Sequence, residues 1–396
     1  LRKKDGSIYR FNLSGRLEYL EDRYANRIAL TYENIYGEER LRYVTDPTTR
    51  QFTFEYWPDG KIKEIKDPTG THKYQYIYNG VNLAQVIDPR GDSKYYEYDP
   101  VTNLRTAYTD RERHRYEYTH TYNARVHAQK DPDLNVTTFE YWWDTTWVTN
   151  KAGETWYYRF YTNSHLLDDI TDNLGTAINY TWDGASNLTQ LDEVYGKTTK
   201  LEYDIKGNVT KITDAENGAS YPTIIQYNPD YSLPTYRKDP KGNETTYVYD
   251  NGKLTEIHEP LNKTTIMTYY PYGKIQTLTD AENNLTEFEY DQWGYPKKIK
   301  RHTETGIVEL NFTYDIVGNL LSETDEEDKT RNYAYDENNN IKEIKDGSNN
   351  IIISKTYDKN DNPKTVTDSL NHIISYEHDW VGNQTKITEY DEFGTE

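Results

Sequence analysis

The chain places its large apolar side chains at alternate positions in short runs. Aromatic residues occupy every second place in Tyr74-x-Tyr76-x-Tyr78, Tyr247-x-Tyr249 and several similar segments. A period of two is typical of a β-strand with one buried face. We find no apolar stripe of period 3.6 that extends beyond two turns, which is the pattern a helix requires. The sequence therefore predicts an all-β protein.

A turn motif follows the aromatic strand. In the segment Asp204 to Gly207 the motif reads Asp-x-x-Gly, and it recurs along the chain. An Asp side chain can hydrogen-bond the backbone of a turn, and Gly accepts a positive φ without steric cost. This chemistry predicts a hairpin with a type I turn followed by a left-handed residue.

A second strand opens with two aliphatic residues that stand three positions apart, such as Val209 and Ile212 or Ile62 and Ile65. Because this spacing would put the pair on opposite faces of a flat strand, we expect either a β-bulge or burial on both faces. The unit then closes with Asp-Pro-x-Gly or a relative, as in Asp239 to Gly242. Pro in second place and Gly in fourth place are typical of a type I turn.

The two-strand unit repeats along the whole chain. The aromatic that ends its first strand, the anchor, recurs every 19 to 24 residues, at Phe11, Tyr32, Tyr56, Tyr78, Tyr98, Tyr122, Tyr141, Tyr161, Trp182, Tyr203, Tyr227, Tyr249, Tyr270, Tyr290, Tyr314, Tyr335, Tyr357 and, substituted, His378. A lone hairpin is marginal in water, whereas stacked hairpins stabilise each other. We therefore predict a single array over residues 1–396, with about 18 repeats of about 21 to 22 residues in an antiparallel, curled β-solenoid.

Composition changes the expected core. The chain has no Cys, 41 Tyr and 8 Trp, and a net charge of −20. Its content of Leu, Ile, Val and Phe is about 18%, which with this charge would indicate disorder. Tyrosine rings bury large areas while keeping a polar tip, so they are the expected core material. The acidic balance argues against nucleic-acid binding, and the chain has no apolar run of the length that spans a bilayer.

Catalytic and metal-binding patterns are weak. Asp336-x-Asn338-x-Asn340 and Asp358-x-Asn360-x-Asn362 imitate the start of a calcium loop, but the later positions lack the required Gly and Glu. Both groups fall on repeat turns, so we interpret them as turn chemistry. The sequence also lacks HExxH, GxSxG and any Cys nucleophile. We expect no enzymatic activity, no cofactor and no metal.

A local concentration of tryptophan exceeds what the repeat requires. It comprises Trp142, Trp143, Trp147 and Trp156. Alternating rings in a repeat are typical of interior cross-strand ladders. Sugars also stack on aromatic faces, so a glycan-binding surface at these four residues remains the alternative.

The repeated motif, Tyr-Asp-x-x-Gly-Asn/Arg-Leu-x-x-Ile-x-Asp-Pro-x-Gly, resembles the YD repeat, also called the RHS repeat. Such repeats occur in bacterial polymorphic toxins, wall-associated toxins, subunits of insecticidal toxin complexes and animal teneurins. The resemblance covers essentially the whole chain. The signature residues that carry it most clearly are Tyr203, Asp204, Gly207, Asn208, Tyr249, Asp250, Tyr290, Asp291, Gly294, Tyr314, Asp315, Gly318, Tyr335, Asp336, Tyr357 and Asp358.

The resemblance implies a function. Family repeats wind into a hollow β-shell around a C-terminal toxic domain, and a terminal core segment carries an aspartic autoprotease. Nothing in this chain resembles that core segment, so no catalytic Asp is carried over. The opening, with Asp5-Gly6 and Phe11-x-x-x-Gly15-Arg16-Leu17, resembles the start of such an array, and the chain begins and ends within repeats. We therefore expect part of a longer, secreted or cell-surface toxin. Its partners would be the toxin cargo and the remaining repeats. The alternative is an adhesive module that binds glycans or cell-surface proteins.

Overall fold

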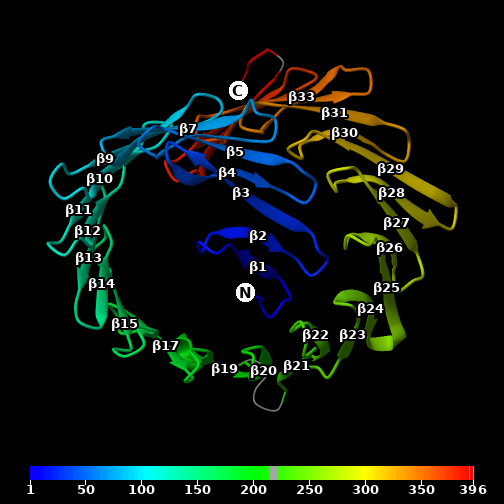
Figure 1. The fold of residues 1–396 in the computed structure, drawn as a ribbon, viewed down its shortest axis with the longest axis horizontal. Coiled ribbons are helices and arrows are strands. Elements are labelled where there is room, and N and C mark those ends of the chain that lie inside the picture. The colour runs from blue at the N-terminus through cyan, green and yellow to red at the C-terminus, as the bar shows by residue number, and fades with distance from the viewer. Residues whose placement is uncertain (215–220, 392, 396) are drawn as a thin grey trace. The chain divides into compact units, whose positions relative to one another are not determined.

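The computed structural model describes residues 1–214, 221–391 and 393–395, and nearly all of its regular structure is β-strand (Figure 1). In these ranges thirty-six strands belong to one sheet, and its strand pairs are antiparallel. Strands that follow each other in the chain pair with each other, for example β13 with β14 and β14 with β15. The all-β antiparallel fold predicted from the sequence is confirmed.

The strands of the first half are β1 Ile8–Phe11, β2 Leu17–Glu21, β3 Arg27–Ile35, β4 Glu38–Thr45, β5 Gln51–Tyr56, β6 Ile62–Lys66, β7 Lys73–Asn79, β8 Asn82–Ile87, β9 Ser93–Tyr98, β10 Arg105–Thr109, β11 Arg115–His120, β12 Val126–Lys130, β13 Val136–Tyr141, β14 Thr145–Thr149, β15 Thr155–Phe160, β16 Leu167–Asp172, β17 Ala177–Trp182 and β18 Leu188–Asp192.

Those of the second half are β19 Thr198–Tyr203, β20 Val209–Thr213, β21 Thr223–Tyr227, β22 Pro234–Lys238, β23 Glu244–Asp250, β24 Lys253–Glu259, β25 Lys263–Tyr269, β26 Ile275–Thr279, β27 Leu285–Tyr290, β28 Pro296–Thr303, β29 Gly306–Tyr314, β30 Leu320–Thr324, β31 Thr330–Tyr335, β32 Ile341–Asp346, β33 Ile351–Tyr357, β34 Pro363–Asp368, β35 Ile373–His378 and β36 Gln384–Tyr390.

Two 3-10 helices, η1 Val194–Gly196 and η2 Pro260–Asn262, lie in turns between strands. Within the described ranges, no helix has the length and apolar character needed to cross a membrane.

The chain forms two compact units. Unit 1 comprises Leu1–Ile8, Glu117–Tyr269 and Leu278–Asn283, and unit 2 comprises Tyr9–Tyr116, Tyr270–Thr277 and Asn284–Glu396. Each repeat within them contributes one hairpin, whose first strand ends at the anchor aromatic or up to three residues after it, as β3 does after Tyr32. We call the turn after the anchor the anchor turn and the turn that ends the repeat the closing turn.

A β-bulge explains the spacing of three between the aliphatic residues. Tyr203 pairs with Val209, but the preceding Glu202 pairs with Lys211, so one residue of the second strand has no opposite partner. The inserted residue brings Val209 and Ile212 to the same face. The same shift recurs in other hairpins, for example between β31 and β32. Of the two alternatives left open by the sequence, the bulge is confirmed.

The anchor turn has the chemistry that its Asp and Gly predict. The Gly207 amide donates to the Asp204 carbonyl at 3.0 Å, and Gly207 has a φ of 74°. The Asp204 carboxylate accepts hydrogen bonds from the amides of Lys206 and Asn208, at 2.8 and 2.9 Å. Closing turns are built in the same way, because Asp239 accepts from the amides of Lys241 and Asn243. Many repeats thus use one turn design at both ends, whereas others have a two-residue turn, as between Asp250 and Lys253.

The sheet has little fully enclosed core. Ala107 and Met267 are the hydrophobic residues classed as buried in the described part of the chain, and no large side chain there is completely enclosed. Tyrosines supply most of the packing instead. Tyr108 lies between Tyr96 and Tyr116 with ring centroids 5.5 and 5.6 Å away, and burial raises the pKa of Tyr108 to about 12. The prediction that aromatic rings replace an aliphatic core fits these contacts.

Three of the anchors predicted from the sequence are wrong by one or two residues. The bulge lies at His120 rather than Tyr122, and at Phe160 rather than Tyr161. In a third repeat, Tyr269 rather than Tyr270 makes the hydrogen bond to the preceding repeat that is described below. In each case a tyrosine in or beside the turn stands next to the true anchor, so spacing alone could not separate them.

Candidate functional site: a polar seam between distant repeats

Turns that are far apart in the sequence lie against each other within unit 2. Closing turns between residues 22 and 116 contact anchor turns between residues 270 and 382. Figure 1 shows β5 and β7 of this unit beside β31 and β33. We call this line of contacts the seam. It joins residues about 250 positions apart, and it does so without pairing strands.

One end of the seam requires a glycine. The Asn26 side-chain amide donates to the Tyr272 carbonyl at 3.1 Å, and the Tyr24 ring packs directly on Gly273. A Cβ atom at Gly273 would lie 2.5 Å from that ring, and Gly273 has a φ of 88°. Both the backbone conformation and the neighbouring turn therefore exclude a larger residue here.

An arginine bridges the next pair of turns. Arg50 donates to the Tyr295 hydroxyl at 2.6 Å and to the Ile316 carbonyl at 3.2 Å, and its guanidinium lies 5.2 Å from the Tyr295 ring centre. Asp46 holds the same guanidinium through an ion pair of 2.6 Å. Burial acts to raise the pKa of Asp46, but hydrogen bonds from Arg50 and Thr48 lower it below its usual value.

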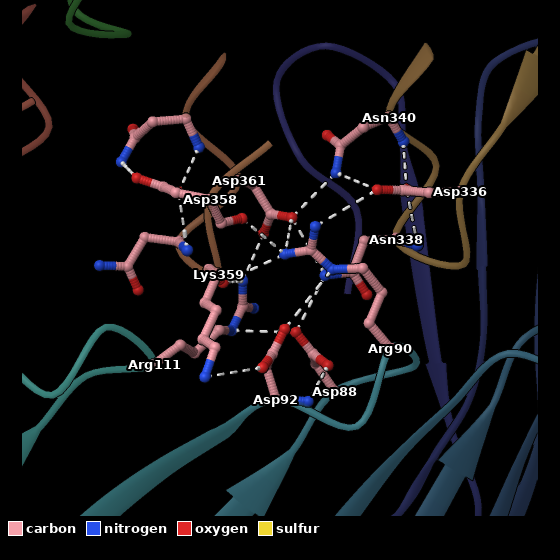
Figure 2. Close-up of polar contacts among 12 residues, drawn as sticks. Asp88, Arg90, Asp92, Arg111, Asp336, Asn338, Asn340, Asp358, Lys359 and Asp361 are labelled. Atoms are coloured by element: carbon pink, nitrogen blue, oxygen red, sulfur yellow. Dashed lines mark hydrogen bonds and ion pairs between the residues drawn. The ribbon is translucent and has the colours of Figure 1, made fainter. Parts of the chain in front are cut away.

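Arg90 and Arg111 form the centre of the seam (Figure 2). Arg90 donates to the carbonyls of Asp358 and Lys359, at 3.0 and 3.2 Å, and its Nη2 lies 2.9 Å from Asp361 Oδ1. Arg111 pairs with Asp361 and also places its Nε 3.1 Å from Asp88 Oδ2. The two side chains are only 15% and 11% exposed, so solvent screens these ion pairs weakly.

Asparagines of the anchor turns complete the central contacts. Asn338 Nδ2 donates to Asp88 Oδ2 at 2.9 Å, and Asn360 Nδ2 donates to Asp110 Oδ2 at 2.6 Å. Asp88 and Asp110 are both only 5% exposed. A buried carboxylate is tolerated only when it is paired or hydrogen-bonded, and here the distant turn supplies the donor.

The other end of the seam is aromatic. The Tyr116 hydroxyl donates to the Trp380 carbonyl at 3.3 Å, and the two rings meet edge to face with centroids 5.6 Å apart. Trp380 thereby extends the row of tyrosine rings formed by Tyr96, Tyr108 and Tyr116. The seam thus combines ring packing with directional polar contacts.

The two groups that imitate calcium loops lie in the seam. Asp358 accepts from the amides of Asn360 and Asn362, and Asp336 accepts from the amides of Asn338 and Asn340. The described residues include no group of three or more His, Cys, Asp or Glu placed to hold a metal ion. The interpretation as turn chemistry agrees with these hydrogen bonds.

Unit 1 has a contact of the same kind. Lys4, in a turn near the N-terminus, donates from Nζ to Asn208 Oδ1 at 3.0 Å. Asn208 belongs to an anchor turn, where its amide nitrogen donates to Asp204 at 2.8 Å, and it is 6% exposed.

Similar proteins were found by sequence and by structure. The chain is 24% identical over 320 residues to the tRNA3(Ser)-specific nuclease WapA of Bacillus spizizenii, and 25% identical over 338 residues to the tRNA nuclease WapA of Bacillus subtilis. These matches cover 72% and 77% of the chain but 13% of each relative. A match to the double-stranded DNA deaminase toxin A of Burkholderia cenocepacia, 26% identical over 156 residues, covers 37% of the chain and 10% of that protein.

Among solved structures, the TcdB2-TccC3 crystal structure matches 98% of the chain with a TM-score of 0.61 at 11% identity. The match covers 28% of that chain, so the fold is shared with one part of a larger protein. No family model matches the chain.

The chain is a YD-repeat array. Its repeat motif, its thirty-six antiparallel strands and these similar proteins agree on that point. It spans only about an eighth of the length of the WapA proteins.

The signature tyrosines connect successive YD repeats. The Tyr203 hydroxyl donates to the carbonyl of Leu188, which opens the second strand of the preceding repeat, at 2.7 Å. The same contact, reaching back 15 or 16 residues, is made by Tyr249, Tyr290, Tyr335 and Tyr357. Tyr314 instead has its ring centroid 5.0 Å from that of Tyr295.

The signature aspartates cap the anchor turns, with one exception. The carboxylates of five of them accept hydrogen bonds from at least two turn amides each: Asp204, Asp291, Asp315, Asp336 and Asp358. Asp250 pairs with Lys253 across a two-residue turn made by Asn251 and Gly252. Gly207, Gly294 and Gly318 each have a positive φ, and Asn208 makes the contact with Lys4.

The four tryptophans do not share one face. The ring centroids of Trp142 and Trp147 are 5.6 Å apart, and those of Trp147 and Tyr157 are 5.3 Å apart, so these rings form a cross-strand row. Trp156 pairs with Val148, the neighbour of Trp147, and therefore points to the opposite face of the sheet. Trp143 lies in an anchor turn and is 91% exposed.

The seam residues Arg50, Arg90, Arg111, Asp361 and Trp380 were not singled out from the sequence. The available signal was weak. Arginine occurs in several closing turns before residue 116, whereas the closing turns at 325–329, 346–350 and 368–372 contain none. This asymmetry marks the N-terminal closing turns as different but names no partner for them.

Proposed function

We propose that this chain is a structural segment of the shell of a larger RHS-type toxin, and that the complete shell encloses a C-terminal toxin domain. The observation that carries the proposal is the seam. A sheet whose closing turns dock on its own anchor turns about 250 residues later can build a continuous wall from one winding to the next. Paired strands and docked turns leave few open hydrogen-bonding groups in such a wall.

The burial pattern supports a wall rather than a globular core. Most described strand residues are half-buried, and no large side chain is completely enclosed. The mean hydropathy of −1.04 is low for an ordered chain of this length. A wall with water or cargo on both sides tolerates polar side chains on both faces, and aromatic rings with polar tips suit that setting.

The relatives support a role that is independent of any one activity. Two of them are named as tRNA nucleases and one as a DNA deaminase toxin, yet all three match this chain. We propose that the shared segment is the scaffold, that this segment is not itself an enzyme, and that the parent protein is secreted or displayed at the cell surface.

Exposed side chains support a longer array. In unit 2 the anchor turns at 12–15 and 99–103 expose Leu13 and Val101, whereas in two seam turns the carbonyls of Ile316 and Trp380 accept hydrogen bonds from a distant part of the chain. We propose that residues 1–396 form one array, that it comes from the N-terminal part of a longer one, and that further YD repeats of the parent cover these turns.

The parent protein provides the test. It should be purified natively, and its native mass should be compared by mass spectrometry with the masses of its denatured chains. A C-terminal piece that is cleaved but stays with the repeat chain until denaturation is the expected result. A single intact chain without an enclosed piece would contradict the cargo role.

Adhesion is the second candidate, and the exposed Trp143 beside the Trp142 and Trp147 rings is the observation that favours it. Trp142→Ala, Trp143→Ala and Trp147→Ala variants should be tested together on a glycan array. Loss of binding with unchanged unfolding would favour adhesion, whereas no glycan binding by the unmodified chain would remove it.

A further inference from the structure

Asp361 is an unusual residue for its position. It stands fourth in the anchor turn 358–362 and has a φ of 71°, in the left-handed region. The same place in the other seam turns is held by Gly273, Gly294, Gly318, Asn339 and Gly382. Asp tolerates this conformation less well than Gly, so its local turn alone does not account for it.

The side chain of Asp361 collects donors from three other turns. Oδ1 lies 2.9 Å from Arg90 Nη2, 3.0 Å from Asn338 Nδ2 and 2.8 Å from Asn340 Nδ2, while Oδ2 accepts from Arg111 Nη1. Figure 2 shows both guanidinium groups directed toward this carboxylate. One carboxylate therefore joins two closing turns to a neighbouring anchor turn.

The surrounding charges make this arrangement specific. Asp88, Asp92 and Asp336 also face Arg90 or Arg111, and Lys359 lies 4.0 Å from Asp92. Burial acts to raise the pKa of Asp361, but hydrogen bonds from Asn338, Asn340 and Arg111 lower it below its usual value. The carboxylate is thus held in its charged form, which is the form that two arginines require.

A shift by one repeat would remove the match. The next anchor turn toward the C-terminus offers Gly382 in place of Asp361, and the preceding one offers Asn339. On the opposite side, the closing turns at 46–50 and 67–72 have Thr48 and Thr69 where Arg90 stands. A shifted pairing would leave buried arginines without their carboxylate, which is costly.

We infer that Asp361, together with Arg90 and Arg111, is a register lock that determines which repeats face each other across the seam. The turns along the seam share one backbone design, so their shape alone distinguishes neighbouring registers poorly. The lock supplies the missing specificity through charge. Its biological use rests on the proposed shell, whose winding it would set, but its effect on register does not depend on any cargo.

The first experiment compares Asp361→Gly with Asn371→Gly. Asn371 has a similar φ of 65° in an exposed closing turn outside the seam. If Asp361 served only its own turn, both variants would leave the seam unchanged. The lock predicts that Asp361→Gly alone speeds hydrogen exchange of amides in residues 88–92 and 110–114 by about tenfold. Asp361→Asn, which keeps an acceptor but loses the charge, should fall between the two.

A second experiment reads the register itself. The chain has no cysteine, so introduced pairs give unambiguous cross-links. Arg23→Cys with Pro271→Cys reports the observed register, and Arg23→Cys with Gln292→Cys reports a shift by one repeat. Such a shift moves a turn by two strand spacings, about 10 Å, so a shorter cross-linker separates the cases.

Asp361→Gly should lower the yield of the first pair severalfold and raise that of the second. If both cross-link yields and the rates of amide hydrogen exchange were unchanged in Asp361→Gly, the register-lock proposal would be wrong. Because both measurements use the isolated chain, they can fail while the parent still encloses a cargo, and they can succeed when it does not.

Discussion

Anchor turns of unit 2 occur in two settings, covered and exposed. In the turn at 12–16, Asn12 accepts from the amides of Ser14 and Arg16, as Asp379 does from Val381 and Asn383 in the turn at 379–383. Yet Leu13 is fully exposed, while Trp380 packs on Tyr116 across the seam. The comparison teaches that the turn forms from its own residues, and that the seam adds side-chain contacts without changing the backbone design.

Acid should have the largest effect, because it acts on both settings. Hydrogen bonds from asparagine side chains, followed by those from turn amides, lower the pKa of many turn aspartates, including Asp183 and Asp379 in anchor turns and Asp239 and Asp346 in closing turns. A carboxylate with a lowered folded pKa contributes stability that is present above its unfolded pKa, near 3.9, and is lost as pH falls through the lower value.

We therefore expect stability to be maintained at pH 6 and to fall steeply below about pH 4. Urea unfolding followed by tyrosine and tryptophan fluorescence at a series of pH values measures this. A midpoint that does not move between pH 6 and pH 3 would contradict the role of the turn carboxylates.

Among substitutions, Arg90→Ala combined with Arg111→Ala should show the largest difference in stability between the covered and the exposed setting. Removing both cations leaves the buried Asp88 and the half-buried Asp361 without their ion pairs, which should cost about 3 kcal/mol of unfolding free energy. Arg10→Ala, which breaks an exposed ion pair of 3.6 Å with Glu18, is the matched control and should cost less than about 0.5 kcal/mol. If the seam variant and the control lost the same unfolding free energy, the seam ion pairs would contribute no more to stability than an exposed ion pair.

A comparison of Gly273→Ala with Gly15→Ala separates the cost of a clash across the seam from the cost of backbone strain. Both glycines have a positive φ in anchor turns, but a Cβ meets the Tyr24 ring at Gly273 and nothing within 4 Å at Gly15. Strain alone should cost about 1 kcal/mol at each site, and the clash should add about 1 to 2 kcal/mol at Gly273. The difference in urea midpoint between the variants measures the clash, and no difference would refute the close approach.

Tyr203→Phe tests the connection between neighbouring repeats, which both settings share. Loss of the hydrogen bond to the Leu188 carbonyl should cost about 1 kcal/mol. Tyr122→Phe is the control, because Tyr122 is fully exposed and should show almost no change. If the two variants unfold at the same urea concentration, the hydroxyl contact is not stabilising.

Leu13→Ser should have the smallest effect on the isolated chain, within about 0.5 kcal/mol, because the side chain is already in water. In the longer parent, if further repeats cover this turn, the same change should destabilise measurably more. Thermal unfolding of both proteins with and without the substitution compares the two, and identical shifts would argue against a cover.

Local features were predictable to a large extent. Aromatic residues at alternate positions correctly predicted strands, and the Asp and Gly residues correctly predicted the capped turns. The spacing of three from Val209 to Ile212 left two explanations for the second strand, a bulge or burial on both faces, and the structure has the bulge. Prediction was wrong where similar residues stand side by side, as at Tyr269 and Tyr270. A one-residue choice between two tyrosines depends on the bulge register, which a period that varies by several residues does not define.

The sequence by itself determined the repeat, its two turns and the packing by tyrosine, because each depends on residues within about 20 positions of one another. Only the tertiary structure decided that Arg90 and Arg111 meet Asp361, and that the Leu13 side chain is fully exposed. Small rotations between successive strands accumulate over many hairpins before distant turns meet. The accumulated rotation depends on all the intervening hairpins and cannot be predicted from a local sequence pattern. The pairs of residues that meet across the seam therefore follow only from the tertiary structure.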